Sequence, residues 1–480
     1  MSNRNSSRAL TRRKFLGDLG AFTGIAIAGG TAPIFASPTA MHKLVAQPGM
    51  ALLRGPAAPS VNVWGYNGVA PGPVLRVKQG DELRVLLKNS IHQPTSLHWH
   101  GIRITNAMDG VPGLTQEPVS PGQTFEYRFR CPDAGTFWYH PHKQSSEQVA
   151  RGLHGILIVE EESPPVFDQD RLMVLDDWRL NKTGQIDSAS FGSIGDRSHG
   201  GRFGNTFTCN GTTDYKLHVI TGERVRFRFC NVANASSFAV QIADHDATVI
   251  AIDGQPVEPF KAQDGVILLS SGQRMDVMVD MTGEPGSASK IKLLGFEQEQ
   301  SLGSLVYAKN RRKREDPLNT PLQLASNPLA TSLDLANAVD ATLTMDGGAM
   351  GGMRGANVYG QFVEMRRLVQ QYGYVWALNG TAGMSKEPLV RVKQGQTIRL
   401  RMVNNTGWPH AMHIHGHHFK QVAGNAGDGY GPVWRDTIVL RRGQELTTAF
   451  VADNPGKWML HCHMLEHQEG GMATWFEVVD

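Results

Sequence analysis

The stretch RVKQGDELRVLLKN at residues 76–89 decides the fold, because the chain repeats it. The letters RVKQG return at the start of RVKQGQTIRLRMVN, residues 391–404, and both stretches end at an asparagine. A weaker copy, GERVRFRFCN, lies between them at residues 222–231. Each copy follows an Asn-Gly pair, at residues 67–68, 210–211 and 379–380. The chain therefore consists of three related units.

Apolar and polar residues alternate within each copy, as Leu83, Val85 and Leu87 illustrate. This alternation is typical of a β-strand with one buried face. The 53 glycines and 25 prolines supply turns, and charged residues make up only 19% of the chain, which argues against a helical bundle or a coiled coil. We predict an all-β chain of three consecutive Greek-key β-sandwich domains.

Two segments separate the three units. The first is the acidic and Pro-Pro stretch at residues 160–167, and the second is the charge run at residues 310–317. We interpret the charge run as a solvated linker rather than as a binding patch. The expected domains are residues 41–162, 163–320 and 321–480.

The N-terminus has the character of an export signal. Arg12 and Arg13 precede a weakly apolar, glycine-rich run from Leu19 to Ala36. This pattern is typical of a Tat-type signal peptide, here residues 1–40, and it predicts export by the Tat machinery to the periplasm. No later stretch approaches the ~20 apolar residues of a membrane span, so we expect no stable membrane insertion.

The net charge excludes another class of function. The formal charge of +3 falls to −1 when residues 1–40, with five basic side chains and one aspartate, are left out. A mature chain of that charge is not expected to bind nucleic acid.

Histidine carries the chemistry. Ten of the 18 histidines fall in four clusters: His98 and His100; His140 and His142; His410, His413 and His415; His461, His463 and His467. His98 and His100 lie 9 and 11 residues after Asn89, and the pair at 413 and 415 has the same offsets from residue 404. In the middle unit these offsets give Val240 and Ile242, so that unit lacks the ligands.

Each His-x-His pair places two imidazoles on one face of a strand. Four pairs provide eight such side chains, and they converge if the first and third units pack together. Imidazole suits copper, zinc, iron and nickel, so one pair alone does not distinguish zinc from copper.

Cys462 points to copper. It lies between His461 and His463 and must face the opposite side of their strand, into the third unit. His410 can turn to that side, and His467 and Met472 follow within ten residues. A thiolate, two imidazoles and a weak thioether form a blue-copper set.

With these motifs, the chain resembles the three-domain multicopper oxidases of the bacterial laccase and cuprous-oxidase type. The resemblance covers essentially the whole mature chain and implies three cupredoxin-like domains and four copper ions. It implies a type 1 copper held by His410, Cys462, His467 and Met472, and a type 2 copper held by His98 and His413. It implies a type 3 pair held by His100, His140, His142, His415, His461 and His463.

The resemblance also implies an activity. The type 1 centre would take single electrons from a small reductant, and the three-copper cluster would reduce O2 to water, with Cys462, His461 and His463 joining the two. We expect the reductant to be a phenol or aromatic amine, delivering electrons near an exposed edge of His467 or His410. The alternatives are a periplasmic cuprous oxidase that oxidises Cu(I) and, in another class, a non-enzymatic copper-binding or structural cupredoxin protein.

Protons for water formation need carboxylates near the cluster. Asp109 resembles the family's acidic residue beside the type 2 copper, although an aspartate before glycine is also typical of a plain turn. Many bacterial relatives have a glutamate directly after the last histidine, where this chain has Gln468. Glu466 or Glu469 could substitute for it.

A glycine-rich segment with Met345, Met350 and Met353 resembles the methionine-rich insert of cuprous oxidases, but it is equally consistent with a flexible loop. Cys209 and Cys230 could lie on neighbouring strands and form a disulfide, and Cys131 could equally be a partner. Four histidines outside the motifs are not expected to be ligands. His417 and His418 should be structural or support the ligands, and His154 and His245 should be hydrogen-bonded or exposed.

Overall fold

The computed structural model describes residues 34–35, 41–296, 300–312, 322–330 and 332–480. Strands dominate, as predicted, and the short helices are α1 (Ser145–Ala150), α2 (Ile194–Ser198), α3 (Met365–Arg367) and α4 (Leu465–Glu469). No helix within these ranges has the length and apolar character needed to cross a membrane. Most of the predicted signal peptide and of the charge run lies outside the described residues. Ile34 and Phe35, inside the expected leader, form β1, which pairs in parallel with β4.

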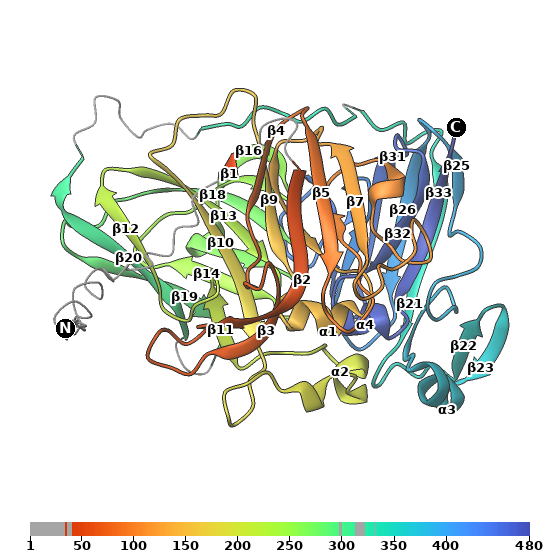
Figure 1. Cartoon of the computed structure of the whole chain (residues 1–480). Helices are drawn as coiled ribbons and strands as arrows, with labels where there is room; N and C mark the ends of the chain where they lie inside the picture. Colours follow the sequence, from red (N-terminus) through yellow and green to blue (C-terminus); the bar gives the residue numbers. More distant parts are fainter. Residues whose placement is uncertain (1–33, 36–40, 297–299, 313–321, 331) are drawn as a thin grey trace, which may run out of the picture. The chain divides into compact units, whose positions relative to one another are not determined.

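The first unit is a pair of sheets with strand orders β1-β4-β9-β8-β6 and β3-β2-β5-β7 (Figure 1). Their strands are β2 (Met41–Ala51), β3 (Val61–Tyr66), β4 (Leu75–Lys78), β5 (Glu82–Asn89), β6 (His98–His100), β7 (Thr124–Arg130), β8 (Gly135–His140) and β9 (Gly155–Glu160). One apolar core fills the space between them, with Trp99, Phe129 and Phe137 among its buried members.

The middle unit repeats this plan with sheets β11-β10-β13-β18-β15-β16 and β12-β20-β19-β14-β17. The strands are β10 (Gln169–Trp178), β11 (Thr206–Cys209), β12 (Tyr215–Thr221), β13 (Arg224–Asn231), β14 (Phe238–Ile242), β15 (Thr248–Ile252), β16 (Gln255–Lys261), β17 (Val266–Leu269), β18 (Arg274–Asp280), β19 (Ala288–Leu294) and β20 (Gln300–Arg311). Val240 and Ile242, at the positions of the missing histidines, are buried in its core.

The third unit has sheets β24-β21-β26-β31-β28-β29 and β25-β33-β32-β27-β30, with the hairpin β22-β23 beside them. The strands are β21 (Val339–Gly347), β22 (Gly355–Val358), β23 (Gln361–Glu364), β24 (Trp376–Leu378), β25 (Arg391–Lys393), β26 (Thr397–Asn404), β27 (His410–Ile414), β28 (Phe419–Gly424), β29 (Trp434–Arg435), β30 (Thr437–Leu440), β31 (Glu445–Val451), β32 (Gly456–Cys462) and β33 (Ala473–Val479). The repeated strands β5, β13 and β26 are each flanked by one parallel and one antiparallel neighbour.

The asparagines that end the repeated strands have one structural task. The side chain of Asn89 accepts from the Ile91 backbone N–H and donates to two carbonyls, one of them on Val119. Asn231 and Asn404 make the same bridges in their own units. Each asparagine thus holds the turn that leads to the strand where the first and third units have their histidines.

The histidine strands pair in the same register in both outer units. His98 is opposite His140 in the β6–β8 pair, and His413 is opposite His461 in the β27–β32 pair. A short helix follows the second histidine strand of each outer unit, β8 and β32, and Figure 1 shows these helices, α1 and α4, beside each other. The repeat therefore brings the two pairs of strands to one junction.

The expected neighbouring positions of Cys209 and Cys230 are wrong. They lie on β11 and β13, with β10 between them, and both are free thiols, as are Cys131 and Cys462. Two strand spacings amount to ~9–10 Å, beyond the Cα separation that a disulfide allows.

Candidate metal centres

Eight histidines from the two outer units converge in one buried cluster. All are at most 8% exposed: His98, His100, His140, His142, His413, His415, His461 and His463. Rings stack across the boundary between the units, with centroids 3.9 Å apart for His98 and His415 and 3.7 Å apart for His100 and His413. Donor atoms of His98, His413 and His415, and of two further histidine triplets, lie within 4.8 Å of one another.

One nitrogen of each cluster histidine is held by the protein. Backbone carbonyls face Nδ1 of His98 (Asp109), His140 (Pro141), His413 (Asp436) and His461 (Cys462). Side chains face Nδ1 of His142 (Gln468), His415 (Asp109) and His463 (Ser271), whereas His100 is held at Nε2, by Asp436. These contacts fix the orientation of each ring.

The other nitrogen points into the cluster. Six of these atoms have no hydrogen-bond partner among the described residues: Nε2 of His98, His140, His142, His413 and His463, and Nδ1 of His100. The last two, Nε2 of His415 and His461, face each other at 3.1 Å. A buried unpaired nitrogen costs about 1–3 kcal/mol, so eight inward nitrogens fit a site built to ligate metal ions.

Electrostatics keep the rings neutral. Burial, reinforced by neighbouring imidazoles, holds the pKa of His140, His142, His415 and His463 well below its usual value. Neutral imidazole is the form that binds metal.

A second donor set lies on the opposite face of β32. The Cys462 Sγ is 3.6 Å from His410 Nδ1 and 3.7 Å from His467 Nδ1, and the two nitrogens are 3.1 Å apart. All three residues are fully buried, and Met472 is buried in the same core. Burial raises the pKa of the Cys462 thiol to about 12, so a bound metal must displace its proton. The donors and their spacing fit a single soft metal ion such as copper.

The comparisons with known proteins agree with this geometry. Sequence profiles described as multicopper oxidase match residues 53–164, 170–287 and 360–480. The multicopper oxidase MmcO of Mycobacterium tuberculosis is 30% identical, over 98% of this chain and 97% of its own length. The chain belongs to the multicopper oxidase family. It is therefore an oxidoreductase that uses copper.

Solved structures give the same result. A multi-copper oxidase from Pseudomonas thermotolerans superposes with a TM-score of 0.78 at 30% identity, covering 93% of this chain and all of the other. Lac15 from a marine microbial metagenome has a TM-score of 0.72 at 36% identity, covering 92% of this chain and all of its own. The three-domain cupredoxin-like fold expected from the sequence is thus confirmed.

Asp109 lies between ligands of both outer units, at the end of the 3-10 turn Asn106–Met108. Its Oδ2 is 2.9 Å from His415 Nδ1 and its Oδ1 is 3.2 Å from His98 Nδ1, and it is 1% exposed. Asp109 is therefore both a turn residue and a direct partner of two cluster histidines.

Glu466 and Glu469, which could have substituted for the glutamate missing at position 468, have hydrogen-bond partners outside the histidine cluster. Gln468, not a glutamate, contacts the cluster, with its amide 3.2 Å from His142 Nδ1 and 3.1 Å from Ser145 Oγ. Glu469 accepts from the Ser146 N–H and hydroxyl. Glu466 accepts from the Asn234 amide and the Arg202 N–H, and burial raises its pKa to about 7. Neither glutamate makes a hydrogen bond to a cluster histidine in the described part of the chain.

The middle unit supplies cluster contacts that the sequence did not reveal. Arg274 donates to Asp436 at 2.9 and 2.5 Å, and Asp436 in turn faces His100 at 3.1 Å. Asp253 accepts from the backbone N–H groups of Arg274 and of residue 437. This chain of contacts joins side chains of all three units, and no motif in the sequence predicts it.

The other singled-out histidines have protein partners. His154 faces Asp176 at 3.1 Å, and His245 lies 2.5 Å from the Tyr307 hydroxyl. His417 approaches the His415 carbonyl and His418 approaches Gln255.

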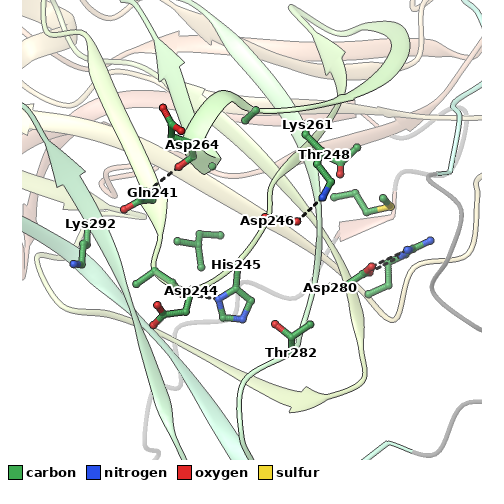
Figure 2. Close-up of a pocket in the computed structure, with 16 residues that line it drawn as sticks. Gln241, Asp244, His245, Asp246, Thr248, Lys261, Asp264, Asp280, Thr282 and Lys292 are labelled. Carbon is green, nitrogen blue, oxygen red and sulfur yellow. Dashed lines mark hydrogen bonds and ion pairs between the residues drawn. The ribbon is translucent and has the colours of Figure 1, made fainter.

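A cavity of about 980 Å³ lies away from these sets, in the middle unit (Figure 2). Its labelled side chains include the Lys261–Asp246 pair, 2.6 Å apart, and Gln241, which donates to the Asp264 carbonyl. None of the candidate copper ligands lines it, so it is not part of the copper site.

The expectation of an exposed histidine edge at the single-metal site is wrong. His410 and His467 are both 0% exposed. The Nε2 of His410 faces the Thr406 hydroxyl at 2.8 Å, and the Nε2 of His467 faces the His199 carbonyl at 2.7 Å. Electrons must therefore cross protein atoms to reach either imidazole.

Proposed function

We propose that the chain is a laccase-like oxidase that couples one-electron oxidation of phenols or aromatic amines to four-electron reduction of O2 to water. The observation that carries this proposal is Cys462, which lies 3.6 and 3.7 Å from two imidazoles on one side of its strand, while its sequence neighbours enter the histidine cluster on the other. A protein that only transfers electrons would need Cys462 and its two imidazoles but not the cluster of eight histidines.

Four copper ions would occupy the site. The type 1 ion would be held by His410, Cys462, His467 and Met472, and the type 2 ion by His98 and His413. The type 3 pair would be held by His100, His140, His142, His415, His461 and His463. Bound copper supplies reversible one-electron chemistry and a place for O2 to be reduced.

The protein connects the two donor sets through the backbone and orients the histidine rings. Cys462 is bonded through the backbone to His461 and His463, and the His461 ring bonds back to the Cys462 carbonyl at 2.8 Å. We assign Asp109 to orienting His98 and His415 and to relaying protons toward the cluster, because its buried carboxylate contacts a ligand from each outer unit. Asp436 also contacts ligands from both outer units, but its carboxylate is paired with Arg274. A proton-donating role for Glu466 stays a prediction.

Phenols are favoured over Cu(I) by the placement of the methionine segment. Met345 is buried in the core of the third unit, Met353 packs against a separate apolar cluster, and Met350 is 78% exposed. Three thioethers that face three different surroundings do not form one Cu(I) site. A laccase of Botryotinia fuckeliana, 29% identical over 86% of this chain, supports the same preference.

The remaining expectations are kept as proposals: a Tat leader at residues 1–40, a periplasmic location, and domains at residues 41–162, 163–320 and 321–480.

Oxygen uptake by the copper-loaded chain tests the function. We expect uptake with 2,6-dimethoxyphenol, together with intense blue absorption, and loss of both in Cys462→Ser. Met350→Leu and Met353→Leu should leave phenol turnover unchanged. Copper binding without colour or oxygen uptake would instead support a storage protein, and a collapse of Cu(I) turnover in the methionine variants would support a cuprous oxidase.

A further inference from the structure

A segment of the middle unit, residues 197–203, covers the single-metal site, and we call it the cap. Three consecutive backbone carbonyls of the cap accept hydrogen bonds from the third unit. The Arg197 carbonyl accepts from Trp376 Nε1 at 2.6 Å, and the Ser198 carbonyl accepts from the Ala349 N–H at 2.6 Å. The His199 carbonyl faces His467 Nε2 at 2.7 Å.

A fourth contact fastens the far end of the cap. The Arg202 N–H donates to Glu466 at 3.1 Å, and Glu466 directly precedes His467 in α4. Figure 1 shows α2, which leads into the cap, next to α4. The cap is therefore an ordered cover whose inner surface is hydrogen-bonded to the buried imidazole.

The outer surface of the cap is aromatic. His199 is exposed, and its ring packs on Trp408 of the third unit with centroids 5.3 Å apart. Phe203 is 48% exposed. The two larger rings both lie against Gly200, where a Cβ atom would come within 2.9 Å of Phe203 and 3.5 Å of Trp408. We call His199, Phe203 and Trp408 the aromatic platform.

The platform is held in place from below. Trp408 donates its indole N–H to the Ala349 carbonyl at 3.2 Å, and the N–H of the same residue, Ala349, fixes the cap. The glycine-rich methionine segment thus supports both partners of the His199–Trp408 pair. This gives the segment a structural task that does not involve its thioethers.

We propose that the aromatic platform is the docking site for aromatic reductants, which suit it because flat rings gain from stacking on aromatic side chains. The inference rests on the proposed function. The platform connects to the metal site because one residue, His199, provides both an exposed ring and the carbonyl bonded to His467. Copper held by His410, Cys462 and His467 would supply a one-electron acceptor. A docked phenol would lose one electron to it and its hydroxyl proton to solvent, and would leave as a phenoxyl radical.

Cu(I) fits the same surface poorly. The exposed thioether of Met350 is the one beside Trp408, with its methyl group within 3.5 Å of a Cβ atom placed at Gly407. The His199 Nδ1 is already engaged by the Gly195 carbonyl at 2.9 Å and the Ser198 hydroxyl at 3.0 Å. Capture of Cu(I) needs several soft ligands.

The test compares His199→Ala, Phe203→Ala and Trp408→Ala with Phe362→Ala, which removes an exposed aromatic ring from β23. His199→Ala keeps the carbonyl that faces His467. Each platform variant should raise the KM for 2,6-dimethoxyphenol about three- to tenfold, with kcat and blue absorption unchanged, because one stacking contact is lost. Turnover of ferrocyanide, which has no ring, should be unaffected, and Phe362→Ala should match the wild type.

Binding of 1,2,3-trimethoxybenzene, a redox-inert ring, to the copper-free chain gives a second readout by saturation-transfer NMR. The signal should fall in the three platform variants and persist in Phe362→Ala. If the KM and this binding are unchanged in His199→Ala and Phe203→Ala while the wild type oxidises phenols, the platform is not the docking site and the oxidase function stands. If the copper-loaded wild type oxidises no phenol, the proposed function fails instead. If Trp408→Ala loses its blue absorption, its copper site is disturbed, and the test then rests on His199→Ala and Phe203→Ala.

Discussion

Replacing Arg274 by methionine would remove the cation that the three units share at the histidine cluster. The Arg274 guanidinium is fully buried and donates to Asp436, to Asp253 at 3.4 Å, and to the carbonyls of Gly272 and Thr136 at 3.1 and 3.2 Å. The variant keeps most of the side-chain volume but leaves two carboxylates buried without their cation.

The expected cost follows from burial. Breaking a buried ion pair by removing one partner costs about 3–5 kcal/mol, because the remaining charge is uncompensated. The pair of Arg401 and Glu445 is a matched control, since its N–O distance is also short, 2.6 Å, but its side chains are 51% and 48% exposed. Arg401→Met should cost far less stability than Arg274→Met, because an exposed ion pair is solvated and contributes little.

The loss of stability in Arg274→Met should depend on pH. Arg274 holds the pKa of Asp436 well below its usual value against the opposing effect of burial. Without Arg274 that pKa rises, so the variant takes up a proton at low pH and escapes part of the penalty. Its deficit relative to the wild type should therefore be larger at pH 8 than at pH 5.

Urea denaturation of the copper-free chains, followed by tryptophan fluorescence at both pH values, measures this deficit. After copper loading, Arg274→Met should also retain blue absorption but hold less copper per chain, because Asp436 no longer orients His100. A deficit as small as that of Arg401→Met, or one that is larger at pH 5, would refute the reasoning.

Three further predictions concern single residues. Cys462→Ser should lose the blue absorption, its phenol turnover and, by elemental analysis, about one copper per chain. Retention of native oxygen uptake would contradict the assignment of Cys462. Gln468→Leu removes a contact to His142 and should weaken copper binding roughly 10- to 100-fold in a chelator titration, whereas Gln468→Glu should retain it; equal losses would show that the contact has no role. Burial raises the pKa of Asp177 to about 6, so the folded chain keeps a proton that the unfolded chain releases near pH 4. The free energy of unfolding of the wild type should therefore fall as the pH rises from about 4 to about 6. Asp177→Asn lacks this fall in urea denaturation of the copper-free chain, and parallel pH curves would count against the shift.

Repetition made the fold predictable. The asparagines at residues 89, 231 and 404 mark the same bridge in each unit, and counting from them places His98 and His413 at equivalent points of equivalent strands. The alternation of side chains along a strand then separates Cys462 from its histidine neighbours. These inferences need only local geometry and one repeated topology.

What the sequence did not reveal depends on how the units pack. The cover over His467 comes from residue 199, and its hydrogen bond is a backbone carbonyl with no side-chain signature. Arg274 lies in an ordinary strand whose register gives no sign that its guanidinium crosses to Asp436. The separation of Cys209 and Cys230 has a related cause: their strands are close in sequence, but β10, from earlier in the chain, lies between them in the sheet.

The middle unit shows why a copy without ligands is retained. Its Ser271 hydroxyl lies 3.2 Å from His463 Nδ1, and at Gly272, where φ is +85°, a Cβ atom would come within 2.8 Å of the same ring. The same unit supplies Arg274 behind Asp436 and the cap over His467. Most outward nitrogens of the outer units' histidines have partners within those two units, and the middle unit supplies the partners of His463 Nδ1 and His467 Nε2. Val240 and Ile242, at the positions of the outer units' histidines, belong to the apolar core of the middle unit, so its contribution to both candidate metal sites comes from other residues, through Ser271, Arg274 and the cap.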